Sequence, residues 1–235
     1  MLYPHKNEGI RLMKKLAIFD LDGTLINTLE TISYFVNTTL AYYGIEAIET
    51  ETFKVLAGDG ARNLIRRSLA LRLKEWEEDF ETEVLKRYNE AYDADFMKLC
   101  KVYDLVPEML TGLKKAGYSL AVLTNKPEPT AVKTIQTLFG QGFFDMVCGQ
   151  RAGIPLKPQP DGAFLIIETC KAKKEHTLYV GDTATDMKTG KAAGLYTVGV
   201  LWGFRKEEEL RTNGADLIIK KPSELLQYVE SISDM

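Results

Sequence analysis

The stretch KKLAIFDLDGTL, residues 14–25, sets a continuous apolar run directly against two carboxylates. Leu16 to Phe19 are four apolar residues without alternation, which is typical of a strand buried on both faces of a parallel sheet. Asp20 and Asp22 follow at the carboxyl end of that strand. The sequence therefore predicts a parallel sheet whose first strand ends in a pair of acidic side chains.

The two aspartates are two positions apart, so in an extended chain their side chains point to the same side. Adjacent carboxylates repel each other, and a protein tolerates such a pair when a cation neutralises it or when one member keeps its proton. The alternative is a simple Asp-Gly turn at the end of a strand, which accounts for Asp22 and Gly23. That turn does not account for Asp20, so we interpret the pair as part of a charged site.

Length and charge restrict the classes of function. A chain of 235 residues suits one large domain, or a core with a smaller insert. The net charge is −3 and no long basic block occurs, so electrostatics do not favour a nucleic-acid partner. Cys100, Cys148 and Cys170 are scattered, with no metal spacing and no disulfide framework, which favours a reducing cytoplasm. No apolar run approaches the roughly 18 residues of a membrane span, and we expect residues 1–13 to be a loosely held extension without a signal peptide.

Two parts of the chain differ in the spacing of their apolar residues. From Asn27 to about Asp93 the apolar residues follow a helical spacing, and no strand is visible. After Leu105, short apolar strands alternate with helices, at residues 118–125, 143–149, 177–182, 195–201 and 215–220. Such alternation produces crossover units on a parallel sheet. We therefore expect an α/β fold in which a doubly wound, Rossmann-like core (residues 14–26 and 95–235) carries an inserted all-α helical cap (residues 27–94).

Ligands of open parallel sheets bind outside the carboxyl ends of the strands. Thr124, Asn125 and Asp182 stand at such ends, and Asp186 follows four positions after Asp182. A helix that begins after this strand would place both of these aspartates on one face. Together with the first pair, four carboxylates could therefore surround one point. Hard oxygen ligands in that number suit Mg²⁺.

Lys157 stands in the segment IPLKPQPD, residues 154–161, among three prolines. The prolines stiffen this loop and fix the direction in which the lysine points. A lone lysine is ordinarily a solvated surface residue. This one follows the third strand, on the edge of the sheet where the carboxylates gather, so we expect it to belong to the site.

Four motifs follow one another along the chain: DLDGTL (20–25), LTNK (123–126), LKPQPD (156–161) and GDTATD (181–186). In this order they resemble the four motifs of the haloacid dehalogenase superfamily in its phosphatase form, and the resemblance covers the chain from about Lys15 to its end. The position of the insert resembles that of members with a helical cap. Within the superfamily, TNKP, KPQPD and the segment that begins WGFRKEEEL are similar to the phosphoglycolate phosphatase group.

The resemblance implies a role for each matched residue. Asp20 is expected to be the nucleophile that takes the phosphoryl group as an aspartyl phosphate. Asp22 is expected to be the general acid for the leaving alkoxide and then the general base for water. Thr124, Asn125 and Lys157 are expected to hold the phosphoryl oxygens.

The resemblance also implies a Mg²⁺ site. Asp20 and the backbone carbonyl of Asp22 are expected to bind the ion, Asp182 to ligate it directly, and Asp186 to bind through water or to orient the site. An acid at Asp22 separates phosphatases from dehalogenases, which need no acid two residues after the nucleophile.

Two alternatives to a Mg²⁺-dependent phosphomonoesterase remain. A phosphomutase of the same fold would return the phosphoryl group to a sugar, and a receiver-like module would accept phosphate as a signal without being an enzyme. The receiver has no use for an acid at Asp22 or for a large helical insert. We therefore expect hydrolysis of a small phosphate ester, with phosphoglycolate as the leading candidate substrate. The sequence does not indicate an oligomeric state.

A glycine-rich segment and the two histidines are further candidates for a functional site. LAGDGARNLI, residues 56–65, is either a turn between helices with a surface arginine, Arg62, or a substrate contact. Of the two histidines, His5 lies in the extension, and His176 precedes a strand at the end away from the carboxyl edge. A Ser-His or Cys-His arrangement therefore has no candidate base.

Overall fold

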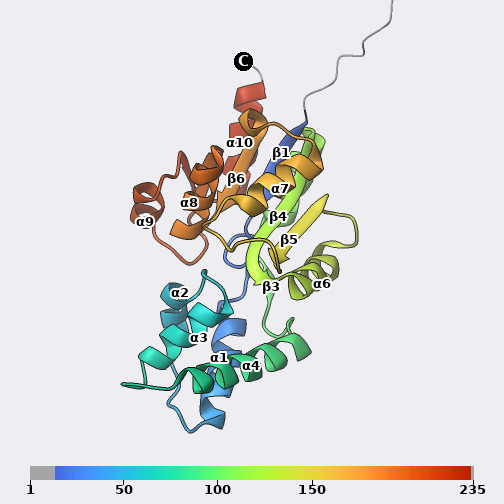
Figure 1. Ribbon diagram of the computed structural model, residues 1–235. Coiled ribbons are helices and arrows are strands. Elements are labelled where there is room, and N and C mark those ends of the chain that lie inside the picture. Colours follow the sequence, from blue (N-terminus) through green and yellow to red (C-terminus); the bar gives the residue numbers. More distant parts are fainter. Residues whose placement is uncertain (1–13, 234–235) are drawn as a thin grey trace, which may run out of the picture.

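A six-stranded parallel sheet is the centre of the computed structural model, which describes residues 14–233 (Figure 1). The strands lie in the order β5-β4-β1-β6-β7-β8, and every neighbouring pair is parallel. They are β1 (Lys15–Phe19), β4 (Tyr118–Pro127), β5 (Met146–Gln150), β6 (Thr177–Gly181), β7 (Tyr196–Val200) and β8 (Leu217–Ile219). The predicted α/β class with a doubly wound parallel sheet is thereby confirmed.

The winding of the chain puts β1 in the middle of the sheet. The chain passes through β4 and β5 on one side of β1, then crosses to β6, β7 and β8 on the other. Phe19, the last residue of β1, pairs with Val122 of β4 and with Val180 of β6. The residues that follow these strands therefore share one edge of the sheet, at the point where the winding reverses, which is where open sheets bind ligands.

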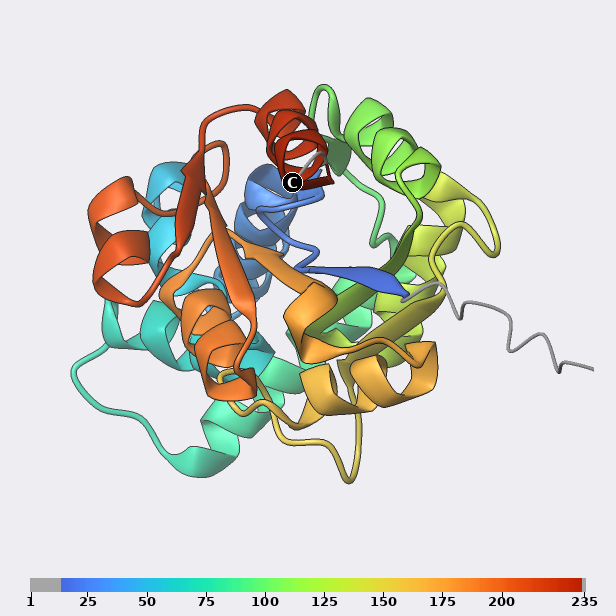
Figure 2. The same cartoon turned by 90° about the horizontal axis from the view of Figure 1, so that it is seen from above.

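Helices cover both faces of the sheet (Figure 2). One face packs against α5 (Val106–Lys115), α6 (Glu128–Phe139) and α10 (Pro222–Ser233). The other face packs against α7 (Asp161–Cys170) and α8 (Ala184–Ala193). Ala17 and Phe19 belong to the first of these apolar clusters, whereas Leu16 and Ile18 belong to the second. Because both faces are covered, β1 has no alternation of polar and apolar residues.

The helices between β1 and β4 include a separately packed group. These are α1 (Leu29–Tyr42), α2 (Phe53–Leu56), α3 (Ala61–Ala70) and α4 (Glu78–Ala94). Their apolar side chains form a separate cluster, which also includes Phe204 from the later part of the chain. Figure 1 shows this helical unit beside the carboxyl edge of the sheet. The division into a core and a cap spanning residues 27–94 stays a prediction.

A short antiparallel ladder joins the two chain segments that connect the sheet with the helical unit. β2 (Ile26–Asn27) pairs antiparallel with β3 (Lys101–Val102). The prediction of no strand from Asn27 onward is therefore wrong by one residue. Two-residue strands produce no periodicity that a sequence pattern could show, because the pairing depends on both passages running side by side.

Glycine and proline residues mark the ends of two helices. Gly140 and Gly194 stand at the carboxyl ends of α6 and α8 with φ of 91° and 74°, which glycine adopts without strain. Pro129 lies in the first turn of α6. Within residues 14–233 the structure contains no helix that is both long and apolar enough to cross a membrane. The extension predicted at residues 1–13 lies outside the described residues, and the cytoplasmic location stays a prediction.

Candidate active site

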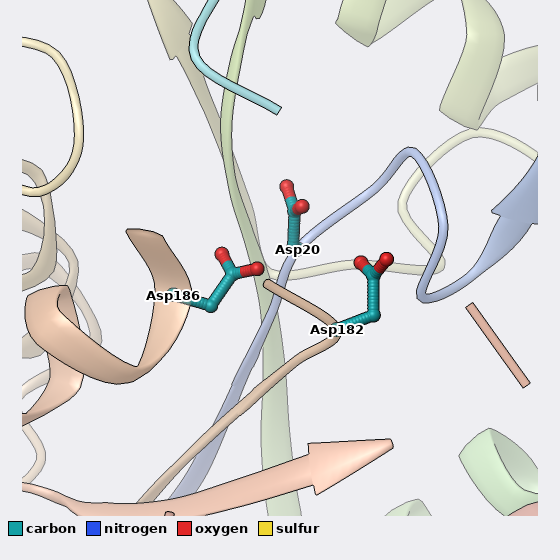
Figure 3. Close-up of side chains that lie close together, drawn as sticks. All are labelled: Asp20, Asp182 and Asp186. Carbon is teal, nitrogen blue, oxygen red and sulfur yellow. The ribbon is translucent and has the colours of Figure 1, made fainter. Parts of the chain in front are cut away.

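Three aspartates meet at the carboxyl edge of the sheet (Figure 3). Asp20 follows β1, Asp182 follows β6, and Asp186 lies in the first turn of α8. One carboxylate oxygen of each lies within 4.8 Å of the others. All three residues are buried. Such a concentration of buried negative charge is costly unless positive charge compensates it.

Lys157 is the cation of this cluster. Its Nζ lies 2.7 Å from Asp20 Oδ1 and 2.7 Å from Asp186 Oδ1. Asn125 holds the lysine's loop from two sides, because its Oδ1 accepts the Lys157 N–H at 2.9 Å and its Nδ2 donates to the Lys157 carbonyl at 3.2 Å. The structure therefore brings Lys157 to the carboxylates, where the sequence analysis expected it.

Burial controls the electrostatics of the cluster. Burial raises the pKa of Asp20 well above its ordinary value, and the charge of Asp186 adds to this while Lys157 acts against it. Burial and the charge of Asp186 raise the pKa of Asp182 to about 7. Burial would lower the pKa of Lys157, but the charges of Asp186 and Asp20 outweigh it and keep the ammonium protonated. One lysine compensates only part of the negative charge of three carboxylates, so the cluster can accept a further cation.

The backbone packs closely around Asp182. Its Oδ1 accepts a hydrogen bond from Thr24 Oγ1 at 3.0 Å, and its Oδ2 accepts one from the Phe204 N–H at 2.8 Å. A Cβ on Gly23, which has a φ of 92°, would lie 2.3 Å from Asp182 Oδ2, and one on Gly203 would lie 2.4 Å from Asp182 Cβ. The glycine of DLDGTL is therefore required by contact with a carboxylate as well as by the turn.

Asp186 also caps the helix on which it lies. Its Oδ2 accepts from the Thr183 N–H at 3.0 Å and from Thr183 Oγ1 at 2.7 Å, and together they form a capping box. Its Oδ1 faces Lys157. Protein donors thus occupy both oxygens, an arrangement that orients the lysine.

The side chain of Asp22 does not join the three carboxylates. Its Oδ1 accepts from Thr28 Oγ1 at 2.8 Å and from Lys126 Nζ at 2.9 Å. The expectation that four carboxylates surround one point is therefore wrong for this side chain. The reason is local: β1 ends at Phe19 and the chain then turns through Gly23, so the alternation of an extended strand no longer applies.

A pocket of about 80 Å³ lies between this edge of the sheet and the helical unit. The sheet contributes Asp20, Asp22 and the run Thr124–Lys126 to its lining, and α4 contributes Tyr88 and Tyr92. The two carboxylates that open the chain's first motif therefore face a small, half-open pocket. This arrangement can hold a small molecule against a buried carboxylate, with the buried ammonium group of Lys157 beside it.

A family model described as haloacid dehalogenase-like hydrolase matches residues 17–200. The chain belongs to the haloacid dehalogenase-like hydrolase family. This confirms the resemblance inferred from the four motifs and shows that the protein is an enzyme of the hydrolase class.

Phosphoglycolate phosphatases are among the relatives of this haloacid dehalogenase-like hydrolase. The chain is 30% identical over 217 residues to a phosphoglycolate phosphatase of Aquifex aeolicus, covering 92% of this chain and 97% of that protein. It is 32% identical over 220 residues to a phosphoglycolate phosphatase of Haemophilus influenzae, covering 92% and 98%. A crystal structure of a predicted phosphoglycolate phosphatase from Haemophilus somnus superposes with a TM-score of 0.85 at 26% identity, over 92% of this chain and 97% of that one.

Lys126 and Tyr92 line the pocket of this hydrolase, although the sequence alone did not indicate either as a site residue. The side chain of Lys126 is 8% exposed, and its Nζ contacts Asp22 and the hydroxyl of Tyr92. Burial would lower the pKa of Lys126, but the charge of Asp22 and the hydrogen bonds to Tyr92 and Asp22 raise the pKa instead. The signal for Lys126 was its place directly after Thr124 and Asn125 in LTNK, and that for Tyr92 was the helical spacing from Tyr88.

The glycine-rich segment of the insert reaches the pocket, but its arginine does not. Gly58 and Gly60 line the pocket, and Arg62 is not among its lining residues. The Arg62 side chain is 48% exposed and pairs with Glu81 at 3.3 Å. The interpretation of Arg62 as a surface residue of an interhelical turn therefore agrees with the structure.

Proposed function

We propose that this chain is a Mg²⁺-dependent phosphatase that hydrolyses small phosphate monoesters through an aspartyl phosphate on Asp20. The observation that carries the proposal is the buried cluster of three aspartates and Lys157, which lies beside a small pocket at the edge of the sheet. Membership of the hydrolase family and the phosphoglycolate phosphatases among its relatives support it.

The donors at the site fit Mg²⁺. The cluster offers hard carboxylate oxygens and has one lysine to compensate three negative charges. We propose that Asp20, Asp182 and the backbone carbonyl of Asp22 hold the ion, and that Asp186 orients Lys157 beside it. When bound, Mg²⁺ supplies positive charge to the carboxylates and to the phosphoryl oxygens.

The first half of the reaction transfers the phosphoryl group to Asp20. An Asp20 oxygen forms a bond to phosphorus while the bond from phosphorus to the ester oxygen breaks. Lys157, 2.7 Å from Asp20, stabilises the negative charge. The Thr124 hydroxyl accepts from the Lys126 N–H at 3.2 Å, which leaves its own hydrogen for a phosphoryl oxygen. Asn125 already bonds Lys157 and the Gly58 carbonyl, so we propose that it positions these loops around the phosphoryl group.

Asp22 serves both halves of the reaction. Its carboxyl group gives a proton to the leaving alkoxide, and the resulting carboxylate takes a proton from the water that attacks the phosphorus. That attack releases inorganic phosphate and restores Asp20. Thr28 and Lys126 hold the Asp22 carboxylate away from the three clustered aspartates.

We propose that residues 27–94 act as a cap over the sheet edge. The helices pack around their own apolar cluster, and they supply one wall of the pocket. A wall of this kind keeps bulk water from the aspartyl phosphate and limits the size of the leaving group. The small pocket and the names of the relatives favour phosphoglycolate as the substrate.

A panel of phosphate monoesters assayed for inorganic phosphate tests this proposal. With Mg²⁺ present, phosphoglycolate is expected to give the highest kcat/KM, and excess chelator is expected to remove nearly all phosphate release. Asp182→Ala is expected to have the same effect without loss of the fold, as judged by circular dichroism. Turnover that persists in chelator would contradict the metal site, and isomerisation of a hexose phosphate without phosphate release would contradict hydrolysis.

A further inference from the structure

A lysine and a phenol from opposite walls meet inside the pocket. Lys126 Nζ lies 2.7 Å from the Tyr92 hydroxyl and 4.6 Å from the centroid of the Tyr92 ring. Lys126 is part of β4 in the sheet, whereas Tyr92 is part of α4 in the helical unit. Both residues line the pocket, and both side chains are almost fully buried. This contact, like that of Asn125 with the Gly58 carbonyl, joins the two walls of the pocket.

The Tyr92 hydroxyl has a hydrogen to donate. An ammonium group can only donate, so the Tyr92 oxygen is the acceptor in its bond with Lys126. The hydrogen of the phenol must therefore point away from Lys126, and within residues 14–233 the bond accepted from Lys126 is the hydrogen bond that the Tyr92 hydroxyl makes. The adjacent ammonium polarises this O–H and makes it a stronger donor. The pocket consequently contains a buried donor that is suited to an oxygen of a bound molecule.

The charges around the pocket restrict where an anion can bind. Among the described residues that line the pocket, Lys126 is the only cation, while Asp20, Asp22 and Asp93 are acidic. Asp93 is occupied by Thr130, whose hydroxyl donates to it at 2.6 Å. Among the described lining residues, an anionic group on the leaving part of a substrate therefore finds a cationic partner only at Lys126, with the Tyr92 hydroxyl beside it.

The distance from Asp22 sets the length of such a substrate. A leaving oxygen that receives a proton from Asp22 lies within about 2.6–3.2 Å of its carboxyl group. Lys126 Nζ lies 2.9 Å and 3.2 Å from the two oxygens of that same group. A group attached to the first carbon after the ester oxygen is thus brought directly to Lys126 and Tyr92, while a longer chain carries its charge past them.

We propose that Lys126 and Tyr92 select esters in which a carboxylate is attached to the carbon that bears the phosphate. The inference rests on the proposed phosphatase function and names the part of the pocket that recognises the leaving group. The Tyr92 O–H and Lys126 Nζ donate to the carboxylate oxygens as charge-assisted hydrogen bonds. Because the two donors come from different walls, the bound carboxylate also holds the helical unit against the sheet.

The test compares phosphoglycolate with 2-hydroxyethyl phosphate, which has the same length but a neutral hydroxymethyl group in place of the carboxylate. Tyr92→Phe removes one hydroxyl and keeps the ring. It is expected to lower kcat/KM for phosphoglycolate by about 10- to 100-fold, chiefly through KM, as for the loss of a hydrogen bond to a charged group. The neutral ester is expected to change by less than about twofold, because it makes no such bond.

Two further variants complete the comparison. Lys126→Met also loses the contact with Asp22, so both esters slow down, but the ratio of kcat/KM for phosphoglycolate to that for the neutral ester is expected to fall. Tyr43→Phe is the matched control, because it removes a surface phenol of the helical unit that bonds Glu83 at 3.0 Å and does not line the pocket. It is expected to leave both esters unchanged.

The outcomes separate this inference from the proposed function. The assignment of Lys126 and Tyr92 is overturned if Tyr92→Phe loses activity equally on both esters. It is also overturned if the wild-type protein does not prefer phosphoglycolate to the neutral ester. In either case, release of phosphate still supports the phosphatase function. A wild-type protein that releases phosphate from neither ester overturns both.

Discussion

Asp20 and Asp22 are two positions apart in the chain but have different partners. Asp20 lies beside Lys157 among the buried carboxylates, whereas Asp22 is held by Thr28 and Lys126 at the pocket wall. The first environment suits a nucleophile whose charge is compensated, and the second suits a group that exchanges protons with the leaving oxygen and with water. Replacing each aspartate by its amide should therefore impair different steps of the reaction.

Asp20→Asn is expected to abolish turnover of every phosphate ester, because an amide neither attacks phosphorus well nor offers charge to a cation. Asp22→Asn is expected to retain the first step with an aryl phosphate, whose leaving group departs without a proton. That variant should release a burst of phenol approaching one equivalent of enzyme and then turn over slowly, while phosphoglycolate barely reacts.

Rapid-quench kinetics and mass spectrometry of the trapped protein would measure both variants. The phosphoryl adduct of Asp22→Asn is expected on Asp20. If that variant reacts with neither ester, or if the adduct lies on another residue, the division of roles between the two aspartates is wrong.

At the scale of elements, the loop between α2 and α3 fastens the helical unit to the sheet. Asp59 Oδ1 accepts from Thr185 Oγ1, in α8, at 2.5 Å. Arg205 Nη2 donates to the Ala57 carbonyl at 2.8 Å, and Asn125 Nδ2 donates to the Gly58 carbonyl at 3.3 Å. Burial would raise the pKa of Asp59, but the hydrogen bonds from Thr185 and the nearby Arg67 lower it, so the carboxylate is charged near neutral pH. Residues of α8, of β4 and of the segment after β7 thus hold a short segment that lines the pocket.

Asp59→Ala is expected to lower kcat/KM for phosphoglycolate by roughly tenfold, since a hydrogen bond to a charged group contributes about 1.5–3 kcal/mol and this one is only half-buried. Thr185→Ala removes the same bond from the other side and should have a similar effect. The double variant should lose little more than either single variant, because the two residues act as one contact. Steady-state kinetics of the four proteins gives the coupling, and additive losses would show that the contact does not hold the loop.

At the scale of the whole molecule, the buried carboxylates link folding to pH and to metal. Asp182 has a pKa of about 7 in the folded protein, against 3.8 for an ordinary aspartate. Between these values the native state keeps a proton that the unfolded chain has released, so the stability from this group is present below pH 4 and is lost as the pH rises through about 7. The lowered pKa of Asp59 acts in the opposite sense, but only at more acidic pH.

The Tm of the metal-free protein is therefore expected to fall between about pH 5 and pH 8. Mg²⁺ should raise the Tm, and by more at pH 8 than at pH 5, because ligand carboxylates must be ionised to bind it. Thermal denaturation followed by circular dichroism measures both effects. Asp182→Asn is the matched control and should flatten the pH dependence and weaken the Mg²⁺ effect. A wild-type Tm that responds to neither pH nor Mg²⁺ would contradict the proposed ion site.

Much of the fold was predictable because the signals for it are local. The unbroken apolar run that precedes Asp20 marks a strand buried on both faces, and the later alternation of strands and helices requires a parallel sheet. The winding of such a sheet brings the ends of β1, β4 and β6 to one edge, so Asp182 and Lys157 could be placed near Asp20 without any knowledge of their side-chain contacts.

The sequence by itself thus determined the sheet, the helical insert and the group of residues at the sheet edge. The tertiary structure decided which of these residues touch one another. The side chain of Asp22 points away from the other carboxylates because the strand ends at Phe19. Lys126 contacts Tyr92 only because α4 and the end of β4 face the same pocket. Asp59 and Thr185, 126 positions apart, bond for the same reason. Periodicity records which face of its own element a residue occupies, whereas a contact between two elements depends on how their buried faces pack together.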